Sequence, residues 1–321
     1  MSLMFGVISW LPNDGGFILT EEQKEEKREQ NLPLRKKRRE IHLRQLEWIM
    51  DNLPKDAIKL GIYQNWNDED FDNDLQGSMT IRRYSEGIGM SRARNAVLKE
   101  FYESTHDWLM LCDDDAWLYD HYDPKSFINE LHTSNKFDNL GAIITLQPSM
   151  SPFKKQNYND LNRDNYVFTK GQLNLGAQVL FIRNVTKSSL NPIYFNVEFF
   201  DRVRYAEDTL FLHDWVTAGY TLHTLNTLIL KMESPNDSSI LGIKSAGELR
   251  KKFQDESKAE LARCTNFEVF EKGGRLVLSS KKVFNITPSP VIVKRAVPLT
   301  FKENEIPKDK NPIKRKLFGR Q

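Results

Sequence analysis

A short apolar run that ends on three consecutive aspartates constrains the fold of this chain more than any other feature. Residues Trp108 to Cys112 are apolar throughout, and Asp113, Asp114 and Asp115 follow at once. An apolar run of this length with a charged end predicts a strand buried inside a sheet. Three adjacent carboxylates repel one another, so a fold that keeps them together normally supplies a cation.

Strand-like runs alternate with helix-like segments over most of the chain. The other predicted strands cover Leu3 to Trp10, Ile58 to Tyr63, Met79 to Tyr84, Gly141 to Leu146, Gln178 to Arg183 and Thr221 to Leu230. The predicted helices are a segment that stops at Pro54, Ala96 to Tyr102, Pro124 to His132 and about Glu207 to Ala218. This alternation predicts an α/β fold, with a mostly parallel sheet and helices on both faces. The aspartates would then lie at the carboxyl edge of the sheet, where α/β folds bind ligands.

The composition shifts after residue 235. We expect residues 1–235 to form the main domain, 236–280 a small accessory region, and 281–321 a basic tail punctuated by prolines. The accessory region reads as a helix from Ser245 to Arg263 and a hairpin from Phe267 to Leu278. The tail holds eleven Lys and Arg against three acids, which indicates a polyanion as a partner or a solvated segment.

Several classes of protein are excluded at this stage. The chain has 321 residues, a formal net charge of +2 and 39% hydrophobic residues, which is enough for an enzyme-sized core. It holds two cysteines, far apart, so we expect neither a disulfide framework nor a thiolate zinc site. We expect no membrane segment and no secretion signal, and therefore a cytoplasmic protein.

The three aspartates suggest a specific division of roles. On an extended backbone Asp113 and Asp115 point to one side and Asp114 to the other. Oxygen ligands favour Mg²⁺ or Mn²⁺, so Asp113 and Asp115 are candidates to share one metal ion and a diphosphate. The alternative is a solvated acidic turn.

The segment from Gly87 to Asn95 precedes a predicted helix. Its glycines do not match the dinucleotide-binding fingerprint. Ser91 is instead expected to cap the helix, whose free amides attract anions, and Arg94 is available to a diphosphate or to the acidic cluster.

These motifs together resemble the GT-A nucleotide-sugar glycosyltransferases. The resemblance rests on Ser91-X-Ala93-Arg94-Asn95, on Asp113 to Asp115 after a hydrophobic strand, and on Glu207-Asp208 at the start of a helix. It implies a GT-A fold of Rossmann-like type, a UDP-sugar donor, and Asp113 and Asp115 as residues that bind metal and donor, with Asp114 also contacting the donor. It also implies Asp208 as the catalytic base with Glu207 beside it. Acids are also common in a first helical turn for reasons of the helix dipole alone.

The resemblance places further residues near the donor. Many relatives have a metal-binding histidine where this chain has Glu233, so Glu233 either replaces that ligand or the ligand is absent. Gly176 lies in a glycine-containing loop expected to approach the donor sugar. Trp10, Asn65 and Trp66 follow predicted strands and are candidates to contact the nucleotide, with packing as the alternative reading.

The acceptor is the least constrained part of the hypothesis. The motif set and the basic tail are similar to phage DNA glycosyltransferases that modify 5-hydroxymethylcytosine, including the type that adds a second sugar. That similarity implies duplex DNA as a partner in a bacterial host cytoplasm. The residues expected to contact DNA phosphate are basic and clustered: Arg35, Lys36, Lys37, Arg38, Arg39, Lys314, Arg315 and Lys316. The alternatives are a surface polysaccharide, lipid or protein acceptor, or an inactive binding module. The end of the tail is a candidate segment for docking to a protein partner.

Overall fold

A computed structural model describes residues 2–11, 20–67, 70–71, 79–85, 87–118, 140–146, 165–167, 178–188, 191–233, 247–265, 267–272 and 275–279. The predicted helix from Pro124 to His132 lies outside these residues. So do Gly176 and the basic tail with Lys314, Arg315 and Lys316.

One large sheet of nine strands forms the centre of the molecule. Its strands are β1 (Leu3–Trp10), β2 (Ile58–Gln64), β3 (Thr80–Tyr84), β4 (Trp108–Asp113), β5 (Ala116–Leu118), β6 (Leu140–Leu146), β7 (Asn165–Val167), β8 (Val179–Arg183) and β9 (Thr221–Met232). Their spatial order is β3-β2-β1-β4-β8-β6-β9-β5, and β7 pairs with β9 off this path. Every strand predicted for residues 1–235 is present in this sheet.

The sheet is mostly parallel, as predicted. Neighbours among β3, β2, β1 and β4 run parallel, and so do β6 and β9. However, β8 lies between β4 and β6 and is antiparallel to both. The short strands β5 and β7 are antiparallel to β9. The reversal of β8 was not predicted, because an apolar run buried on both faces carries no mark of its direction.

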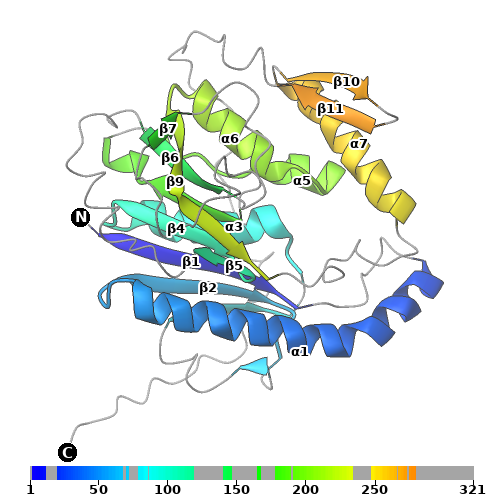
Figure 1. The fold of residues 1–321 in the computed structure, drawn as a ribbon, viewed down its shortest axis with the longest axis horizontal. Coiled ribbons are helices and arrows are strands. Elements are labelled where there is room, and N and C mark those ends of the chain that lie inside the picture. The colour runs from blue at the N-terminus through cyan, green and yellow to red at the C-terminus, as the bar shows by residue number, and fades with distance from the viewer. Residues whose placement is uncertain are drawn as a thin grey trace, which may run out of the picture.

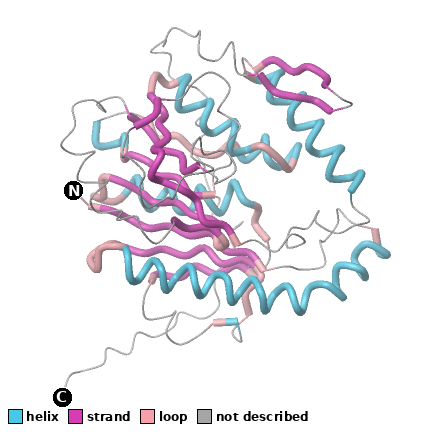
Figure 2. The backbone as a smooth tube through the Cα atoms, viewed as in Figure 1, coloured by secondary structure: helices cyan, strands magenta, loops and turns pink. Residues whose placement is uncertain are grey.

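Helices cover both faces of the sheet (Figures 1 and 2). They are α1 (Glu21–Asn52), α3 (Met90–Glu103), the 3-10 helix η5 (Val185–Ser188), α5 (Val197–Val203), α6 (Glu207–Thr217) and α7 (Gly247–Cys264). Figure 1 shows α1 along one face, with α3, α5 and α6 on the other. The predicted three-layer α/β arrangement is therefore confirmed.

Alternate residues of β1 supply two separate cores. Phe5 and Val7 belong to the core that α1 covers, whereas Met4 and Ile8 belong to the core under α3. This is the period of two expected of a strand covered on both sides. Gly6 allows α3 to approach β1 closely, because a Cβ atom there would lie 2.3 Å from a methyl carbon of Val97.

Helix α1 is much longer than predicted. It begins with a capping box between Thr20 and Gln23 and continues through Pro33 to Asn52, just before Pro54. Figure 1 shows that its N-terminal part extends past the ends of β1 and β2. Neither α1 nor any other described helix combines the length and apolar character needed to cross a membrane.

The predicted C-terminal helix and hairpin are both present. The hairpin consists of β10 (Glu268–Lys272) and β11 (Arg275–Ser279), which pair antiparallel. Helix α7 packs against the end of α5 through a small apolar cluster of Phe199, Val203, Leu210 and Leu261. This contact joins the C-terminal elements to the helices that carry the candidate site.

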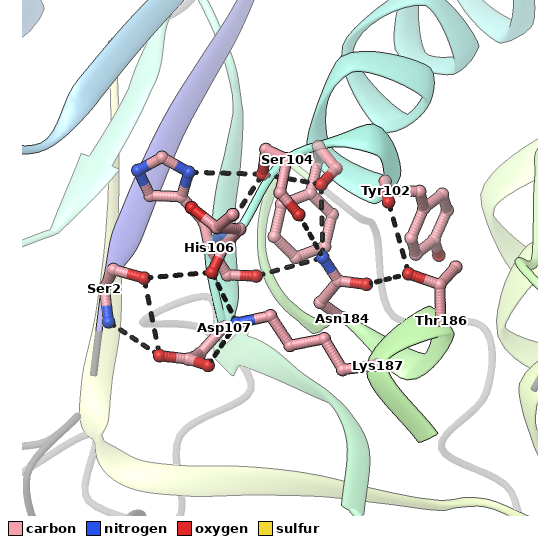
Figure 3. A network of polar contacts seen from close by, with 10 residues as sticks. Ser2, Tyr102, Ser104, His106, Asp107, Asn184, Thr186 and Lys187 are labelled. Atoms are coloured by element: carbon pink, nitrogen blue, oxygen red, sulfur yellow. Dashed lines mark hydrogen bonds and ion pairs between the residues drawn. The ribbon is translucent and has the colours of Figure 1, made fainter. Parts of the chain in front are cut away.

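A polar network fixes the end of the sheet opposite the aspartates (Figure 3). Nδ2 of Asn184 donates to the carbonyl oxygens of Phe101, Ser104 and His106, at distances from 3.0 to 3.4 Å. Asp107 accepts hydrogen bonds from the backbone N–H of Ser2 and from the Lys187 ammonium. The network joins the end of α3 to the start of β4 and thereby fixes how these two elements meet.

Candidate active site

The candidate site lies where the carboxyl ends of neighbouring parallel strands meet. Asp113 ends β4, Trp10 ends β1 and Asn65 follows β2. Because β1 lies between β2 and β4 in the sheet, these three residues share one edge. The amino ends of α3 and α6 bring Arg94 and Glu207 to the same place.

The three aspartates, which we call the acidic turn (Asp113 to Asp115), face different surroundings. Asp114 has no exposed surface and accepts hydrogen bonds from Oγ of Ser9, the backbone N–H of Trp10 and the Arg38 guanidinium. The side chains of Asp113 and Asp115 are 18% and 11% exposed. The partners of the Asp114 carboxylate inside the protein favour a structural role over its predicted contact with the donor. Asp114 and Asp115 lie in a turn and not on an extended backbone, and Arg38 is near both of them, at 2.5 and 3.9 Å.

Arg94 links the acidic turn to the Glu-Asp pair. Its Nη1 lies 2.8 Å from Oε1 of Glu207, and its Nη2 lies 3.1 Å from Oδ1 of Asp113. The guanidinium also packs over the ring of Phe195, 5.1 Å from the ring centroid. One buried cation thus binds two carboxylates that belong to different elements and lie 94 residues apart in the sequence.

Both carboxylates that Arg94 binds have raised pKa values. Burial raises the pKa of Asp113 to about 6; the charge of Arg94 opposes this effect and Asp115 adds to it. Burial likewise raises the pKa of Glu207 to about 7, again opposed by Arg94, with Asp208 adding to the rise. Carboxyl groups with such values are typical of sites that bind cations or move protons, although ion-pair networks alone also produce them.

Asp208 lies in the first turn of α6, beside Glu207. Its Oδ1 accepts a hydrogen bond from the backbone N–H of Thr209 at 2.7 Å. Helix α6 begins after Ala206, which has a φ of 60° and supplies no side-chain cap. The carboxylate of Asp208 therefore contributes to the start of the helix, and its role as a base stays a prediction.

Two residues predicted to contact the nucleotide have partners inside the protein. Trp66 is 3% exposed, donates from Nε1 to Oγ of Ser9, and packs against Tyr63 and Phe71. Asn65 is 9% exposed, with a positive φ of 59°, and donates from Nδ2 to the carbonyl oxygen of Leu11. These contacts favour the packing alternative for both residues, and their contact with the donor stays a prediction.

Trp10 and Ser91 have different outcomes. Trp10 is half-buried at the end of β1, with the Arg38 guanidinium 5.9 Å from its ring centroid, and remains a candidate contact. Ser91 does not cap α3: the N-cap is Gly89, whose φ of 87° suits glycine, and the helix begins at Met90. Oγ of Ser91 is buried and has no hydrogen-bond partner among the described residues.

The basic cluster of α1 largely faces inward. Arg35 pairs with Asp70, Arg38 pairs with Asp114, and Arg39 donates to the carbonyl oxygen of Asp70. These internal partners favour a structural role for the three arginines over the predicted contact with DNA, which stays a prediction. Lys36 and Lys37, between them, are exposed.

Glu233 lies beside the acidic turn but is paired elsewhere. Its backbone N–H donates to the carbonyl oxygen of Asp115 at 3.1 Å, while its carboxylate accepts from Arg44 at 2.5 Å. Within the described residues, no group of three or more His, Cys, Asp or Glu side chains is arranged to hold a metal ion. The prediction that Glu233 is a metal ligand finds no support in this arrangement.

A metal ion held by two carboxylates nevertheless fits the acidic turn. Asp113 and Asp115 both retain exposed surface, and both supply the oxygen ligands that Mg²⁺ and Mn²⁺ prefer. These ions are commonly bound by one or two carboxylates together with water and substrate phosphates. The residues present therefore suit a metal that binds together with a diphosphate.

Sequence reasoning missed the residues that bind the acidic turn from the interior of the protein. Ser9 and Arg38 bond to the Asp114 side chain, and Gln45 donates to the carbonyl oxygens of Asp113 and Ala116. The spacing of Arg35, Arg38, His42 and Gln45 places them on one face of α1 and was the available signal.

Comparisons with known proteins give only distant structural similarity. No family model matches the chain, and no curated protein matches its sequence. Among solved structures, it is similar to S. aureus TarS 1-349, with 14% identity, a TM-score of 0.43, and coverage of 80% of this chain and 65% of that one. It is also similar to the mannosyltransferase PcManGT from Pyrobaculum calidifontis in complex with GDP-Man and Mn²⁺, with 11% identity, a TM-score of 0.44, and coverage of 81% and 64%.

A third similar structure is GalNAc-T7 with UDP, GalNAc and Mn²⁺, with 10% identity, a TM-score of 0.43, and coverage of 83% of this chain and 53% of that one. The chain thus spans less than two thirds of the length of each of these three solved chains. Similarity at this level says nothing about what this chain binds or transfers.

Proposed function

We propose that the chain is a metal-dependent glycosyltransferase of the GT-A type that takes a sugar from a UDP-sugar. The observation that carries this proposal is the convergence of Asp113, Arg94 and Glu207 at the carboxyl edge of a mostly parallel sheet. Ligands of α/β proteins bind at this edge. Arg94 lies between the partly exposed carboxylates of Asp113 and Glu207. This arrangement suits a substrate that carries both a diphosphate and a sugar.

Each residue of the site has a role in this proposal. Asp113 and Asp115 hold Mn²⁺ or Mg²⁺ together with the donor diphosphate, and Trp10 lies beside them at the end of β1. The bound metal supplies Lewis-acid stabilisation of the charge that develops on the departing UDP. Arg94 is near enough to Asp113 to add a second positive charge beside that diphosphate.

The acceptor hydroxyl must lose a proton as it attacks the sugar. Asp208 is the proposed base, and Glu207, held by Arg94, lies beside it in the first turn of α6. We expect Asp208→Asn to bind UDP with Mn²⁺ as the wild type does and to lose most transfer activity, about 100-fold or more. A transfer rate equal to that of the wild type would place the base elsewhere.

The proposed acceptor is DNA that contains 5-hydroxymethylcytosine or its glucosylated form. Its support is the resemblance of the short motifs to those of phage enzymes and the remaining basic residues, namely exposed Lys36 and Lys37 and the tail residues Lys314, Arg315 and Lys316. Contacts with phosphate would make binding depend steeply on salt. A polysaccharide, lipid or protein acceptor leaves the same donor chemistry in place.

The decisive experiment measures UDP release from a panel of UDP-sugars with Mn²⁺. Duplexes that contain cytosine, 5-hydroxymethylcytosine or its glucosylated form serve as acceptors, and mass spectrometry of the DNA follows each reaction. A mass gain of one sugar on the modified duplexes alone would support the whole proposal. Donor hydrolysis without DNA modification would keep the glycosyltransferase and exclude this acceptor, whereas no UDP binding or release with any donor would contradict the enzyme itself.

A further inference from the structure

One face of α1 carries a row of polar side chains, two of which contact the acidic turn directly. The row, which we call the α1 polar stripe, consists of Arg35, Arg38, His42 and Gln45. Steps of three, four and three residues keep these side chains on the same side of a helix. His42 and Gln45 have no exposed surface, so their polar atoms need partners inside the protein.

Gln45 holds the backbone on both sides of the acidic turn. Its Nε2 donates to the carbonyl oxygens of Asp113 and Ala116, each at 2.6 Å. These two residues are the last of β4 and the first of β5. His42 fixes the amide of Gln45, because Nδ1 of His42 lies 2.9 Å from Oε1 of Gln45 and Nε2 of His42 lies 2.8 Å from Oη of Tyr63.

Arg38 holds the middle residue of the same turn. Its Nη2 and Nε donate to both oxygens of Asp114, whose carboxylate also accepts from Ser9 and from the backbone N–H of Trp10. A buried carboxylate needs such compensation, and the arrangement leaves Asp114 a single orientation. Nη2 of Arg38 also lies 3.9 Å from Oδ2 of Asp115, so one guanidinium contacts two of the three carboxylates of the turn.

We propose that Arg38 and Gln45 are positioning residues that set the geometry of Asp113 and Asp115 for binding a divalent cation with the diphosphate of a nucleotide. This inference rests on the proposed function. Asp114 is then an anchor of the turn, held by Arg38 and Ser9, and does not contact the donor. Neighbouring groups that orient metal ligands commonly change metal affinity or activity about 10- to 100-fold when they are replaced.

The test measures the Kd for UDP in the presence of Mn²⁺ by titration calorimetry, at a temperature where each variant is folded by circular dichroism. Gln45→Met keeps the length and neutral charge of the side chain and removes both hydrogen bonds to the turn. Glu47→Met, an exposed position on the same helix, is the matched control. Arg38→Met is compared with Arg82→Met, which breaks an exposed ion pair on β3.

We expect Gln45→Met to raise the Kd about 10-fold or more, with Glu47→Met and Arg82→Met unchanged. A purely structural role would lower the melting temperature and leave the Kd of the folded protein as it was. A Kd for Gln45→Met within about twofold of the wild type therefore overturns the inference, even if Arg38→Met does not fold. If the wild type itself binds no UDP with Mn²⁺, the proposed function is wrong and the inference falls with it.

Discussion

Nη1 of Arg94 lies 2.8 Å from Oε1 of Glu207, although one residue is on α3 and the other opens α6. The same guanidinium reaches Asp113 at the end of β4. Arg94 is therefore the link between the residues proposed to bind metal and donor and the pair proposed to contain the base. An arginine suits this place because its planar group offers several donors in fixed directions.

Replacement of Arg94 by methionine is expected to destabilise the fold strongly. It would leave the buried carboxyls of Asp113 and Glu207 without their cation, which typically costs about 3–5 kcal/mol. Urea unfolding measures this change. Arg92→Met is the matched control, because Arg92 pairs with Asp201 at a position where the Arg92 side chain is 38% exposed, and its loss should cost about 1 kcal/mol or less. Equal losses of unfolding free energy for the two variants would contradict the claim that Arg94 compensates two buried carboxylates.

Replacement by asparagine should affect mainly stability at Asp114 and mainly UDP binding at Asp113. Asp114→Asn weakens the compensation of buried Arg38 and should lower the unfolding free energy by about 3 kcal/mol or more. Asp113→Asn removes a carboxyl whose pKa burial has already raised, and should cost about 1 kcal/mol or less while abolishing UDP binding with Mn²⁺. Denaturant unfolding and titration calorimetry on both variants provide the measurements, and a stable Asp114→Asn protein with lost binding would reverse the assigned roles.

The strands and the location of the site were predictable because their signals are local. The apolar run before Asp113 marks a strand by itself, and the alternation of elements then places its carboxyl end at the functional edge. Glu207 and Asp208 likewise sit at a helix start, as predicted. What brings Glu207 to Asp113 is a single arginine on a third element, and no local pattern specifies that pairing.

Sequence reasoning says least about side chains whose partners are distant in the sequence. Trp66 at the end of a strand looks the same whether it meets a nucleotide or packs against Tyr63. The basic run of α1 resembles a phosphate-binding patch, yet Arg38 lies opposite a carboxylate 76 residues away. Charge in a sequence indicates only that a partner is needed, and the fold decides whether that partner is solvent, ligand or protein.

The raised pKa of Glu207 predicts a pH dependence of stability. Folding raises this pKa from 4.5 to about 7. A carboxyl whose pKa rises on folding contributes stability that is complete below the unfolded pKa and is lost as the pH rises through the folded pKa. The unfolding free energy of the wild type, measured relative to Glu207→Gln, should therefore fall between about pH 4.5 and pH 7.5, by at most about 3 kcal/mol. Denaturant unfolding across this range checks it, and a difference that does not change with pH would show that Arg94 keeps Glu207 ionised throughout.

Asn184 should be a stability residue with no effect on the donor. Its Nδ2 serves three carbonyl oxygens at the end of the sheet opposite the acidic turn (Figure 3). Asn184→Ala leaves these buried acceptors without that donor, so we expect a loss of about 2–4 kcal/mol in the unfolding free energy. Lys187→Met removes a 38% exposed ammonium from the same network and should cost about 1 kcal/mol or less. Since neither residue lies near Asp113, the Kd for UDP with Mn²⁺ should match that of the wild type in both folded variants; a weakened Kd would mean that the two ends of β4 are coupled.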